Sequence, residues 1–229
     1  MSVHVVTGAG SGIGASLTSR LLDRGDAVIA VVRDAGRARQ LSAELPGIAT
    51  LVGDLENPGR LAWALSKQTL PERIDSLVHA AGTVDLGGVA DLTAASWQKQ
   101  IAVNLLAPAE LTRLFLPVLR VSAARVVFVN SGAGLRANPE WSAYAASKHG
   151  LKALADSLRA EEHANGVHVT TVYPGRTATP MQQKVHQQEG AEYHPERFID
   201  PDSVARSILT AIDLPRDAEI TDLSIRPGR

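Results

Sequence analysis

The fold is decided near the beginning of the chain by the stretch Val3-His4-Val5-Val6-Thr7-Gly8-Ala9-Gly10-Ser11-Gly12-Ile13-Gly14. Its first five residues are mostly β-branched and predict a short strand, and the glycines that follow predict a tight loop. Glycines permit positive φ angles and let a backbone approach a pyrophosphate, whose charge is stabilised by the free N–H groups and dipole of a helix N-terminus. The stretch therefore predicts a strand, a phosphate-binding loop and the first turn of a helix.

Two sets of glycines in this loop can be read as a nucleotide-binding motif. Gly10-x-Gly12-x-x-Ala15 fits the general dinucleotide fingerprint. We prefer the set that starts at Gly8, because it begins directly where the strand turns. The loop lacks the lysine of a P-loop, which disfavours hydrolysis of nucleoside triphosphates. The residues expected to touch a dinucleotide here are Gly8, Ser11, Gly12, Ile13 and Gly14.

The rest of the chain repeats the alternation of strand and helix. Short β-branched apolar runs are separated by longer stretches of helical character, and they cover residues 3–7, 27–32, 48–52, 74–79, 125–130, 167–173 and 219–225. Such alternation predicts βαβ units and a parallel sheet. Several of the runs are almost continuously apolar, as strands are when helices cover both faces of a sheet. We predict a single doubly wound α/β domain over residues 1–229.

Two long helices and one irregular segment complete this organisation. Residues 93–120 carry an apolar stripe interrupted by Pro108, a predicted kink, and residues 142–165 end at a helix-stopping Asn165-Gly166. Residues 176–200 are polar, rich in Gln and His, and fit neither pattern. Long irregular segments in compact domains are usually lids or binding loops. We predict a substrate lid over residues 176–200, with surface disorder as the alternative.

The composition is that of an ordinary globular protein, with 45% hydrophobic residues and a formal net charge of -1, and it gives no reason to expect nucleic acid. The chain contains no cysteine, and its histidines lack the close pairing of a metal site. No signal peptide is evident, and we find no run of about 18 apolar residues uninterrupted by charge. We expect no metal, nucleic acid or membrane partner, and a cytoplasmic location.

Tyr144 and Lys148 lie four residues apart, and Ser131 stands thirteen residues before the tyrosine. Residues four apart share one face of a helix, so the phenol and the ammonium can point at one spot. At about 4 Å and an effective dielectric of about 20, their attraction is roughly 4 kcal/mol. An attraction of that size would lower the pKa of the tyrosine from about 10 towards neutrality, where it both donates and accepts protons efficiently. Taken alone, the pair is a common coincidence of helix spacing.

The end of the second expected strand, Val31-Val32-Arg33-Asp34, bears on the type of dinucleotide. In NAD sites an acidic residue near this strand end accepts hydrogen bonds from the ribose 2′-OH, whereas an arginine accommodates the 2′-phosphate of NADP. Arg33 favours NADP over NAD, with Ser11 and Arg37 as helpers. Asp34 leaves the alternative open, because it would become the ribose acceptor if the strand ran one residue longer.

With these motifs placed in order, the chain resembles the short-chain dehydrogenase/reductase family along essentially its whole length. Thr7-Gly8-x-x-x-Gly12-x-Gly14 is similar to the cofactor loop of the single-domain branch, and Ser131, Tyr144 and Lys148 match the family's catalytic set. The resemblance implies a Rossmann-type fold and hydride transfer between a nicotinamide and a carbonyl or alcohol carbon. In that role Tyr144 exchanges the proton, Ser131 orients the substrate oxygen, and Lys148 lowers the tyrosine pKa and holds the nicotinamide ribose.

Further segments carry the same resemblance. Asp54-Leu55 looks like the pair that touches adenine, and Asn104 stands where the family has an asparagine that holds a water in a proton relay. Val78-His79-Ala80-Ala81-Gly82 matches the Asn-Asn-Ala-Gly motif, although His79 and Ala80 replace both asparagines. Pro174-Gly175-Arg176-Thr177-Ala178-Thr179 resembles the segment over the nicotinamide. The resemblance thus adds to the expected cofactor contacts Asp54, Leu55, Ala81, Gly82, Pro174, Gly175, Thr177 and Thr179.

The function predicted from these residues is NADP-dependent oxidoreduction of a small carbonyl or alcohol substrate. Family likeness also implies a homodimer or homotetramer built on the two long helices. One alternative is a regulator that binds NADP without chemistry, which would need only the cofactor-binding half of the motifs. Another is an isomerase or dehydratase that uses the same cofactor.

Overall fold

The computed structural model describes residues 1–228, and its centre is one parallel sheet of seven strands in the order β3-β2-β1-β4-β5-β6-β7. The strands are β1 (Val3–Thr7), β2 (Ala27–Val32), β3 (Ala49–Val52), β4 (Ser76–His79), β5 (Arg125–Val129), β6 (His168–Pro174) and β7 (Asp222–Ile225). This topology confirms the predicted single doubly wound domain. The strand order reverses between β1 and β4, and in such sheets ligands bind outside the carboxyl ends of the strands at this point.

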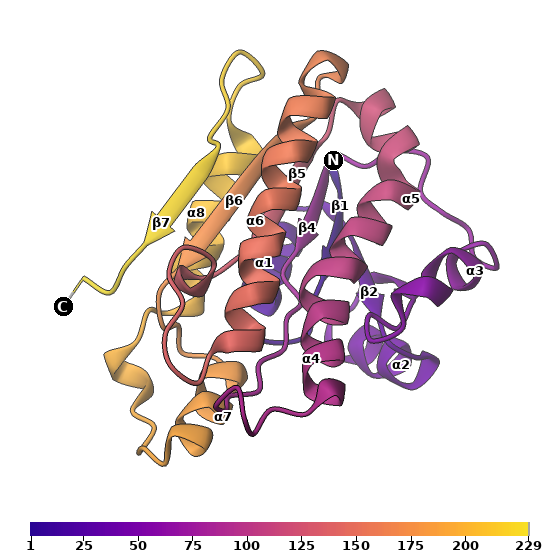
Figure 1. Cartoon of the computed structure of the whole chain (residues 1–229). Coiled ribbons are helices and arrows are strands. Elements are labelled where there is room, and N and C mark those ends of the chain that lie inside the picture. Colours follow the sequence, from indigo (N-terminus) through magenta and orange to yellow (C-terminus); the bar gives the residue numbers. More distant parts are fainter. Residues whose placement is uncertain (229) are drawn as a thin grey trace.

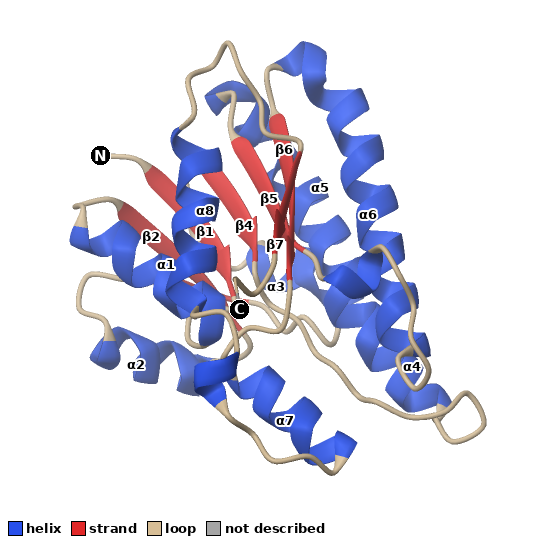
Figure 2. Cartoon of the chain, turned by 90° about the vertical axis from the view of Figure 1, so that its left-hand side faces the viewer, coloured by secondary structure: helices blue, strands red, loops and turns tan. Residues whose placement is uncertain are grey.

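Helices cover both faces of the sheet, as Figure 2 shows edge-on. One face carries α1 (Gly12–Asp23), α2 (Ala35–Glu44) and α8 (Pro201–Asp213). The other face carries α3 (Leu61–Leu65), α4 (Ala94–Ile101), α5 (Ala107–Ser122) and α6 (Ser142–Glu162), with the long α5 and α6 side by side in Figure 1. A further helix, α7 (Pro180–Glu189), lies beyond the carboxyl ends of the strands.

The strands feed two separate hydrophobic cores because successive side chains of a strand point to opposite faces. In β5, Val126 and Phe128 join the core under α5 and α6. Val127 and Val129 join the core under α1 and α8. All of these side chains are buried, and each contributes about 1.5–3 kcal/mol relative to exposure to water. The strands are almost continuously apolar because helices cover both faces of the sheet.

The long helical stretch Ala94–Ser122 is apolar and long enough to cross a membrane by length and composition alone. Its apolar stripe packs inside the protein, since Leu111, Phe115 and Leu119 are buried in the core under α5. The stretch is also irregular: a π-turn, η2 (Ala102–Leu106), separates α4 from α5. Pro108 follows this turn and has no N–H with which to continue the α-helical ladder. The irregularity predicted at Pro108 thus lies just before it.

The polar segment 176–200 is folded. It contains α7 and the short 3₁₀ turn η5 (Pro195–Arg197), and a parallel bridge between Thr177 and Ile199 closes its base. Inside it, the rings of His186, Tyr193 and Phe198 pack together, with His186 at 5.0 Å from Phe198 between centroids. These contacts give the segment a small core of its own. The remaining 3₁₀ turns are η1 (Pro58–Arg60), η3 (Gly132–Gly134) and η4 (His163–Asn165).

Candidate active site

The glycine loop joins β1 to α1, and its conformation needs glycine at the three positions preferred from the sequence. Gly8 has a φ of 72° and Gly12 a φ of 52°, a region that side chains disfavour. At Gly14 a Cβ atom would lie 2.3 Å from the carbonyl oxygen of Gly8, so the helix could not start so close to the strand. The loop thus presents backbone N–H groups at a helix N-terminus.

The charged residues after β2 are arranged around the start of α2. The strand ends at Val32, and the carboxylate of Asp34 caps α2 by accepting the backbone N–H of Arg37 at 2.8 Å. The side chain of Arg33 is 77% exposed, where it also contacts Asp34. Arg37 reaches back to the glycine loop and donates from Nη2 to the carbonyl oxygen of Gly10 at 3.2 Å. Asp34 is therefore engaged as a helix cap, and Arg37 stands beside the loop.

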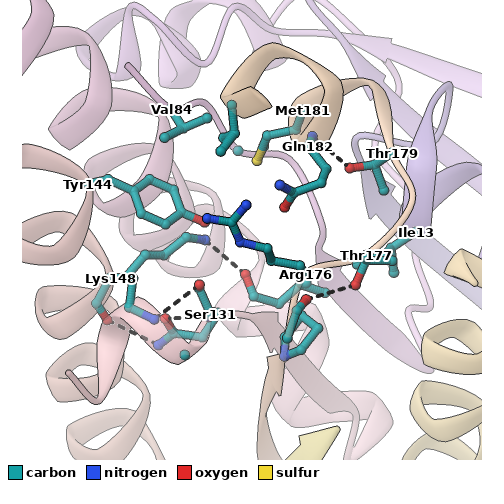
Figure 3. Close-up of a pocket in the computed structure, with 18 of the residues that line it drawn as sticks. Ile13, Val84, Ser131, Tyr144, Lys148, Arg176, Thr177, Thr179, Met181 and Gln182 are labelled. Carbon is teal, nitrogen blue, oxygen red and sulfur yellow. Dashed lines mark hydrogen bonds between the residues drawn. The ribbon is translucent and has the colours of Figure 1, made fainter. Parts of the chain in front are cut away.

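Ser131, Tyr144 and Lys148 converge at the carboxyl end of β5, as Figure 3 shows. Ser131 follows Asn130, the first residue after β5, and caps η3, where its Oγ accepts the backbone N–H of Ala133 at 3.1 Å. Tyr144 and Lys148 lie one turn apart on α6, and both are buried. The helical spacing predicted from the sequence brings the phenol and the ammonium to one place.

Asn130 holds this arrangement together, and sequence reasoning did not single it out. Its Nδ2 donates to the backbone carbonyl of Lys148 at 3.0 Å, and its Oδ1 accepts the backbone N–H of Ser131 at 2.9 Å. Gly134 leaves room for this amide, because a Cβ there would lie 2.4 Å from Oδ1. An asparagine between an apolar strand and the serine was the available signal. Asn130 thereby fixes β5 against α6.

The ammonium of Lys148 lies under the tyrosine ring, with Nζ 5.8 Å from the ring centroid. It donates a hydrogen bond to the carbonyl oxygen of Val129 at 2.9 Å. The tyrosine ring also meets Trp141 edge-on, with centroids 5.7 Å apart. The tyrosine thus contacts both an indole and a buried cation.

Burial dominates the titration of both groups. Removal from water raises the pKa of Tyr144 to about 12, and the hydrogen bond with Ser131 offsets only part of this effect. Burial also lowers the pKa of Lys148 to about 8. The predicted fall of the tyrosine pKa towards neutrality is therefore wrong for this protein. The cost of desolvating a phenolate outweighs the attraction between the two charges, and residue spacing does not reveal that cost.

Asn104 lies in the π-turn η2 and is completely buried. Its Oδ1 accepts the backbone N–H of Thr83 at 2.8 Å, while its Nδ2 donates to the carbonyl of Thr83 at 2.9 Å and to Ser147 Oγ at 3.0 Å. A Cβ on Gly82 would lie 3.4 Å from Asn104 Oδ1 and 3.9 Å from Lys148 Nζ. Gly82 therefore keeps an open space between the asparagine and the lysine.

The glycine loop and the tyrosine line one cavity of about 690 Å³. Arg176 and the start of α7 cover it, and Thr179 packs against the loop, since a Cβ on Gly12 would lie 2.9 Å from Thr179 Cγ2. Thirteen of the predicted site residues line this cavity: Gly8, Ser11, Gly12, Ile13, Ala81, Gly82, Ser131, Tyr144, Lys148, Pro174, Gly175, Thr177 and Thr179. Those set back from its wall are Gly14, Arg33, Asp54, Leu55 and Asn104.

Two of the expected family motifs are altered locally. The carboxylate of Asp54 is engaged within its own turn, where it accepts from the backbone N–H of Glu56 at 3.0 Å and from Asn57 Nδ2 at 2.6 Å. His79 points into the core, where it stacks on Phe128 and contacts Thr112 Oγ1 at 2.9 Å. Burial lowers the pKa of His79 to about 3, which keeps the ring neutral. Neither side chain reaches the cavity.

Among residues 1–228, no group of three histidine, aspartate or glutamate side chains is placed to hold a metal ion. The cavity instead brings together backbone donors, a serine, a tyrosine and a lysine. This combination suits a phosphate-bearing ligand at one end and proton transfer at the other.

Comparison with known proteins places this site in a family. The family model described as short chain dehydrogenase matches residues 2–190. An uncharacterized short-chain type dehydrogenase/reductase of Sinorhizobium fredii is 30% identical over 230 residues, which cover 98% of this chain and 91% of that protein. A solved oxidoreductase of the short-chain dehydrogenase/reductase family from Burkholderia thailandensis has a TM-score of 0.84 and 31% identity, covering 99% of this chain and 92% of that chain.

A 3-ketoacyl-(acyl-carrier-protein) reductase from Brucella melitensis, solved as a complex with NADH, shares the fold with a TM-score of 0.82. Its identity is 22%, covering 100% of this chain and 98% of that chain. Proteins of this family use nicotinamide cofactors and act on small molecules. The chain belongs to the short-chain dehydrogenase/reductase family and is an oxidoreductase of that family.

Proposed function

We propose that this protein catalyses NADP-dependent hydride transfer between a nicotinamide and a carbonyl or alcohol carbon, with Tyr144 exchanging the proton of the substrate oxygen. The observation that carries the proposal is the convergence of Ser131, Tyr144 and Lys148 in the cavity that the glycine loop opens into. An NADP-binding regulator would need the loop alone. We find no observation that favours the regulator, or an isomerase or dehydratase, over hydride transfer.

The residues present fit a dinucleotide. The loop has no room for a Cβ at Gly8, where the backbone of Ala81 lies 2.8 Å away, and the cavity runs from this loop to the tyrosine. When bound, the cofactor supplies or accepts the hydride. The residues proposed to hold it are Gly8, Ser11, Gly12, Ile13, Gly14, Asp54, Leu55, Ala81, Gly82, Tyr144, Lys148, Pro174, Gly175, Thr177 and Thr179.

The chain's own groups manage the proton. Tyr144, with its pKa at about 12, stays protonated at neutral pH and donates from Oη to a carbonyl oxygen. Lys148, with its pKa at about 8, carries its charge at neutral pH and stabilises the phenolate that donation leaves behind. Ser131 Oγ accepts the backbone N–H of Ala133 and hydrogen-bonds with Tyr144, so its hydroxyl stands beside the phenol where it would orient the substrate oxygen. Asn104 helps to connect Lys148 to solvent through water beside Gly82.

We assign the preference for NADP to Arg33, with Arg37 as a helper. The guanidinium of Arg37 already contacts the glycine loop, and Arg33 is exposed at the end of β2, where a ribose 2′-phosphate is expected. Asp34, the competing ribose acceptor, is occupied as the cap of α2. We further propose that segment 176–200 acts as the substrate lid and that the protein is a cytoplasmic homodimer or homotetramer.

The test is the substitution Tyr144→Phe. Loss of the proton donor should lower kcat by about 10²–10⁴-fold on a carbonyl substrate found by screening aldehydes and ketones with NADPH and NADH. NADPH binding, measured by fluorescence, should stay within a few-fold of wild type. Tyr193→Phe is the matched control, because it removes a phenol from the 176–200 segment outside the cavity wall. Near-normal turnover by Tyr144→Phe would refute the assignment.

A further inference from the structure

The wall of the cavity is positively charged. Its ionisable side chains besides Tyr144 are Arg136, Lys148, Arg176 and Arg226, and none of its lining residues is an aspartate or glutamate. Arg176 is neutralised, because its guanidinium contacts the carboxylate of Glu189 through both terminal nitrogens. Within residues 1–228, neither Arg136 nor Arg226 pairs with a carboxylate. The cavity therefore holds two arginine charges with no anionic partner in the described chain.

Arg226 is held in place by the edge of the sheet. Its neighbour Ile225 accepts the backbone N–H of Gly175 at 2.8 Å. On the other side, Pro227 packs against Gly175, where a Cβ would lie 3.1 Å from the proline Cδ. Arg226 directly follows β7, and the side chain of Ile225 before it packs against the core under α1 and α8. The hydrogen bond at Ile225 and the packing of Pro227 thus fix the backbone on both sides of Arg226.

The guanidinium of Arg226 ends beside the catalytic serine. A Cβ atom on Gly132 would lie 2.9 Å from Arg226 Nη1, and Gly132 directly follows Ser131. Arg136 belongs to the turn that starts at Gly132, where its backbone N–H donates to the carbonyl oxygen of Gly132 at 3.1 Å, and it also lines the cavity. Two arginines from distant parts of the chain therefore line the cavity that contains Ser131.

The position of these charges separates them from the cofactor's phosphates. The glycine loop follows β1, whereas Gly132 follows β5, two strands away in the order β1-β4-β5. Two strand spacings amount to about 10 Å. The pyrophosphate has its own donors in the loop, with Arg37 beside it. The unpaired arginines lie instead at the end of the cavity where Ser131 would orient the substrate.

We propose that the substrate is an anion, an oxo acid or the corresponding hydroxy acid, whose carboxylate is bound by Arg226 with support from Arg136. A guanidinium presents a planar pair of N–H donors that matches the two oxygens of a carboxylate. In the reduction, the carbonyl carbon receives the hydride and its oxygen the proton of Tyr144, so that C=O becomes CH–OH and the carboxylate is unchanged. This inference rests on the proposed function and adds the class of substrate.

The test compares each acid with its own ester. Wild-type protein is assayed with NADPH on acetoacetate against methyl acetoacetate, and on pyruvate against methyl pyruvate. We expect at least one acid to exceed its ester by about 30-fold or more in kcat/KM. Arg226→Gln should lower kcat/KM for that acid by about 10–100-fold, mainly through KM, and leave the ester unchanged. Arg226→Lys keeps the charge and loses the planar fork. Its kcat/KM for that acid should fall between the values of wild type and Arg226→Gln.

A matched control separates a local effect from the loss of one positive charge. Arg206 is an exposed arginine on α8 and does not line the cavity, so Arg206→Gln should leave acids and esters alike at wild-type values. Esters reduced as well as acids, with Arg226→Gln altering neither, would overturn the anion site and leave the proposed function intact. A clear preference for a phosphorylated ketone such as dihydroxyacetone phosphate over every acid would overturn the choice of carboxylate.

A binding measurement distinguishes failure of the two proposals. If wild-type protein reduces no carbonyl compound with either cofactor, the proposed function fails, and thermal denaturation with malonate or with malonamide then tests the anion site alone. Malonate should raise the melting temperature of wild type and of Arg206→Gln but not of Arg226→Gln, while malonamide should raise none. An equal response of wild type and Arg226→Gln to malonate overturns the anion site.

Discussion

Lys148 carries a charge that folding removes from water. Burial holds its pKa at about 8 in the folded protein, whereas a lysine in an unfolded chain titrates near about 10.4. Between these two values the unfolded chain binds more protons than the folded protein, so the free energy of unfolding rises with pH. Tyr144 acts in the opposite sense, because its raised pKa of about 12 makes folding less favourable above the unfolded value of about 10.

We expect the free energy of unfolding of wild type to rise by about 2 kcal/mol between about pH 7 and pH 10, relative to Lys148→Met. The rise comes from Lys148 alone in this window, since the opposing effect of Tyr144 begins only near its end. Urea unfolding followed by circular dichroism across this range measures it. Lys152→Met, one turn further along α6 and half exposed, is the control and should track wild type. Parallel pH profiles for Lys148→Met and wild type would contradict the expectation.

At the level of single residues, the sequence predicted which groups meet but not how they titrate. Spacing alone placed Tyr144 and Lys148 on one face of a helix, and the structure has them together. Their pKa values depend on burial by segments that are far away in the chain. The spacing of the two residues gives no information about that burial. Asn130 escaped notice for a similar reason, since the carbonyl group of Lys148 that its side chain binds lies on α6 and becomes its neighbour only in the folded protein.

At the level of elements, apolar runs predicted the strands to within a few residues. The largest difference is the last strand, expected over 219–225 and observed as Asp222–Ile225. Glu219 meets β6 with its side chain, accepting the backbone N–H of Val169 at 2.7 Å, so the ladder cannot start there. The π-turn before Pro108 also lay beyond sequence reasoning, because the missing N–H predicts a disruption but not its form.

The helix α7 is joined to the opposite side of the cavity by a few polar contacts. Lys184 donates to the carbonyl oxygen of Val84 at 2.8 Å and also pairs with Asp85. Gln188 Oε1 accepts the backbone N–H of Leu86 at 3.1 Å. These bonds connect the segment 176–200 to residues 84–86 across the cavity, and they are partly exposed. Val185 of α7 also packs with Val84 in a small buried cluster, so the polar contacts supply only part of what holds the segment closed.

Lys184→Met should therefore increase the opening of segment 176–200. We expect limited proteolysis within this segment to become several-fold faster, while the melting temperature of the protein changes by only a few degrees. Mass spectrometry of the fragments locates the cuts. Lys152→Met again serves as the control, since it removes a lysine of similar exposure that contacts only its own helix. Cleavage at the wild-type rate would show that these bonds do not hold the segment closed.

At the level of the whole molecule, the face of α5 and α6 is the expected contact between copies of the chain. Leu106, Pro117 and Val121 fall on one stripe of this helical stretch by their spacing, and Val121 is 84% exposed. Arg120 and Glu162 tie α5 to α6 through two hydrogen bonds of 2.8 and 2.7 Å. The two helices thus present one continuous surface with apolar side chains on it.

We expect light scattering after size exclusion to give the mass of a homodimer or homotetramer at micromolar concentration. Val121→Glu places a charge on the stripe and should shift the protein towards monomer, because burying an unpaired carboxylate is costly. Val89→Glu makes the same change at a residue that is 76% exposed and lies outside these helices, and it should leave the mass unchanged. A monomeric wild type would contradict the proposed assembly.

The edge strand β7 has a consequence for how such a protein can change over evolution. Tyr144 and Lys148, the groups proposed to exchange and stabilise the proton, lie at the carboxyl end of β5 and are buried. Arg226 stands at an exposed edge, where one backbone hydrogen bond and one proline position it over Gly132. Replacing a side chain there disturbs little packing, whereas replacing Lys148 or Tyr144 disturbs both the core and the chemistry. Single substitutions at the edge of the sheet can therefore change which substrates bind, while the residues proposed to carry out the reaction stay the same.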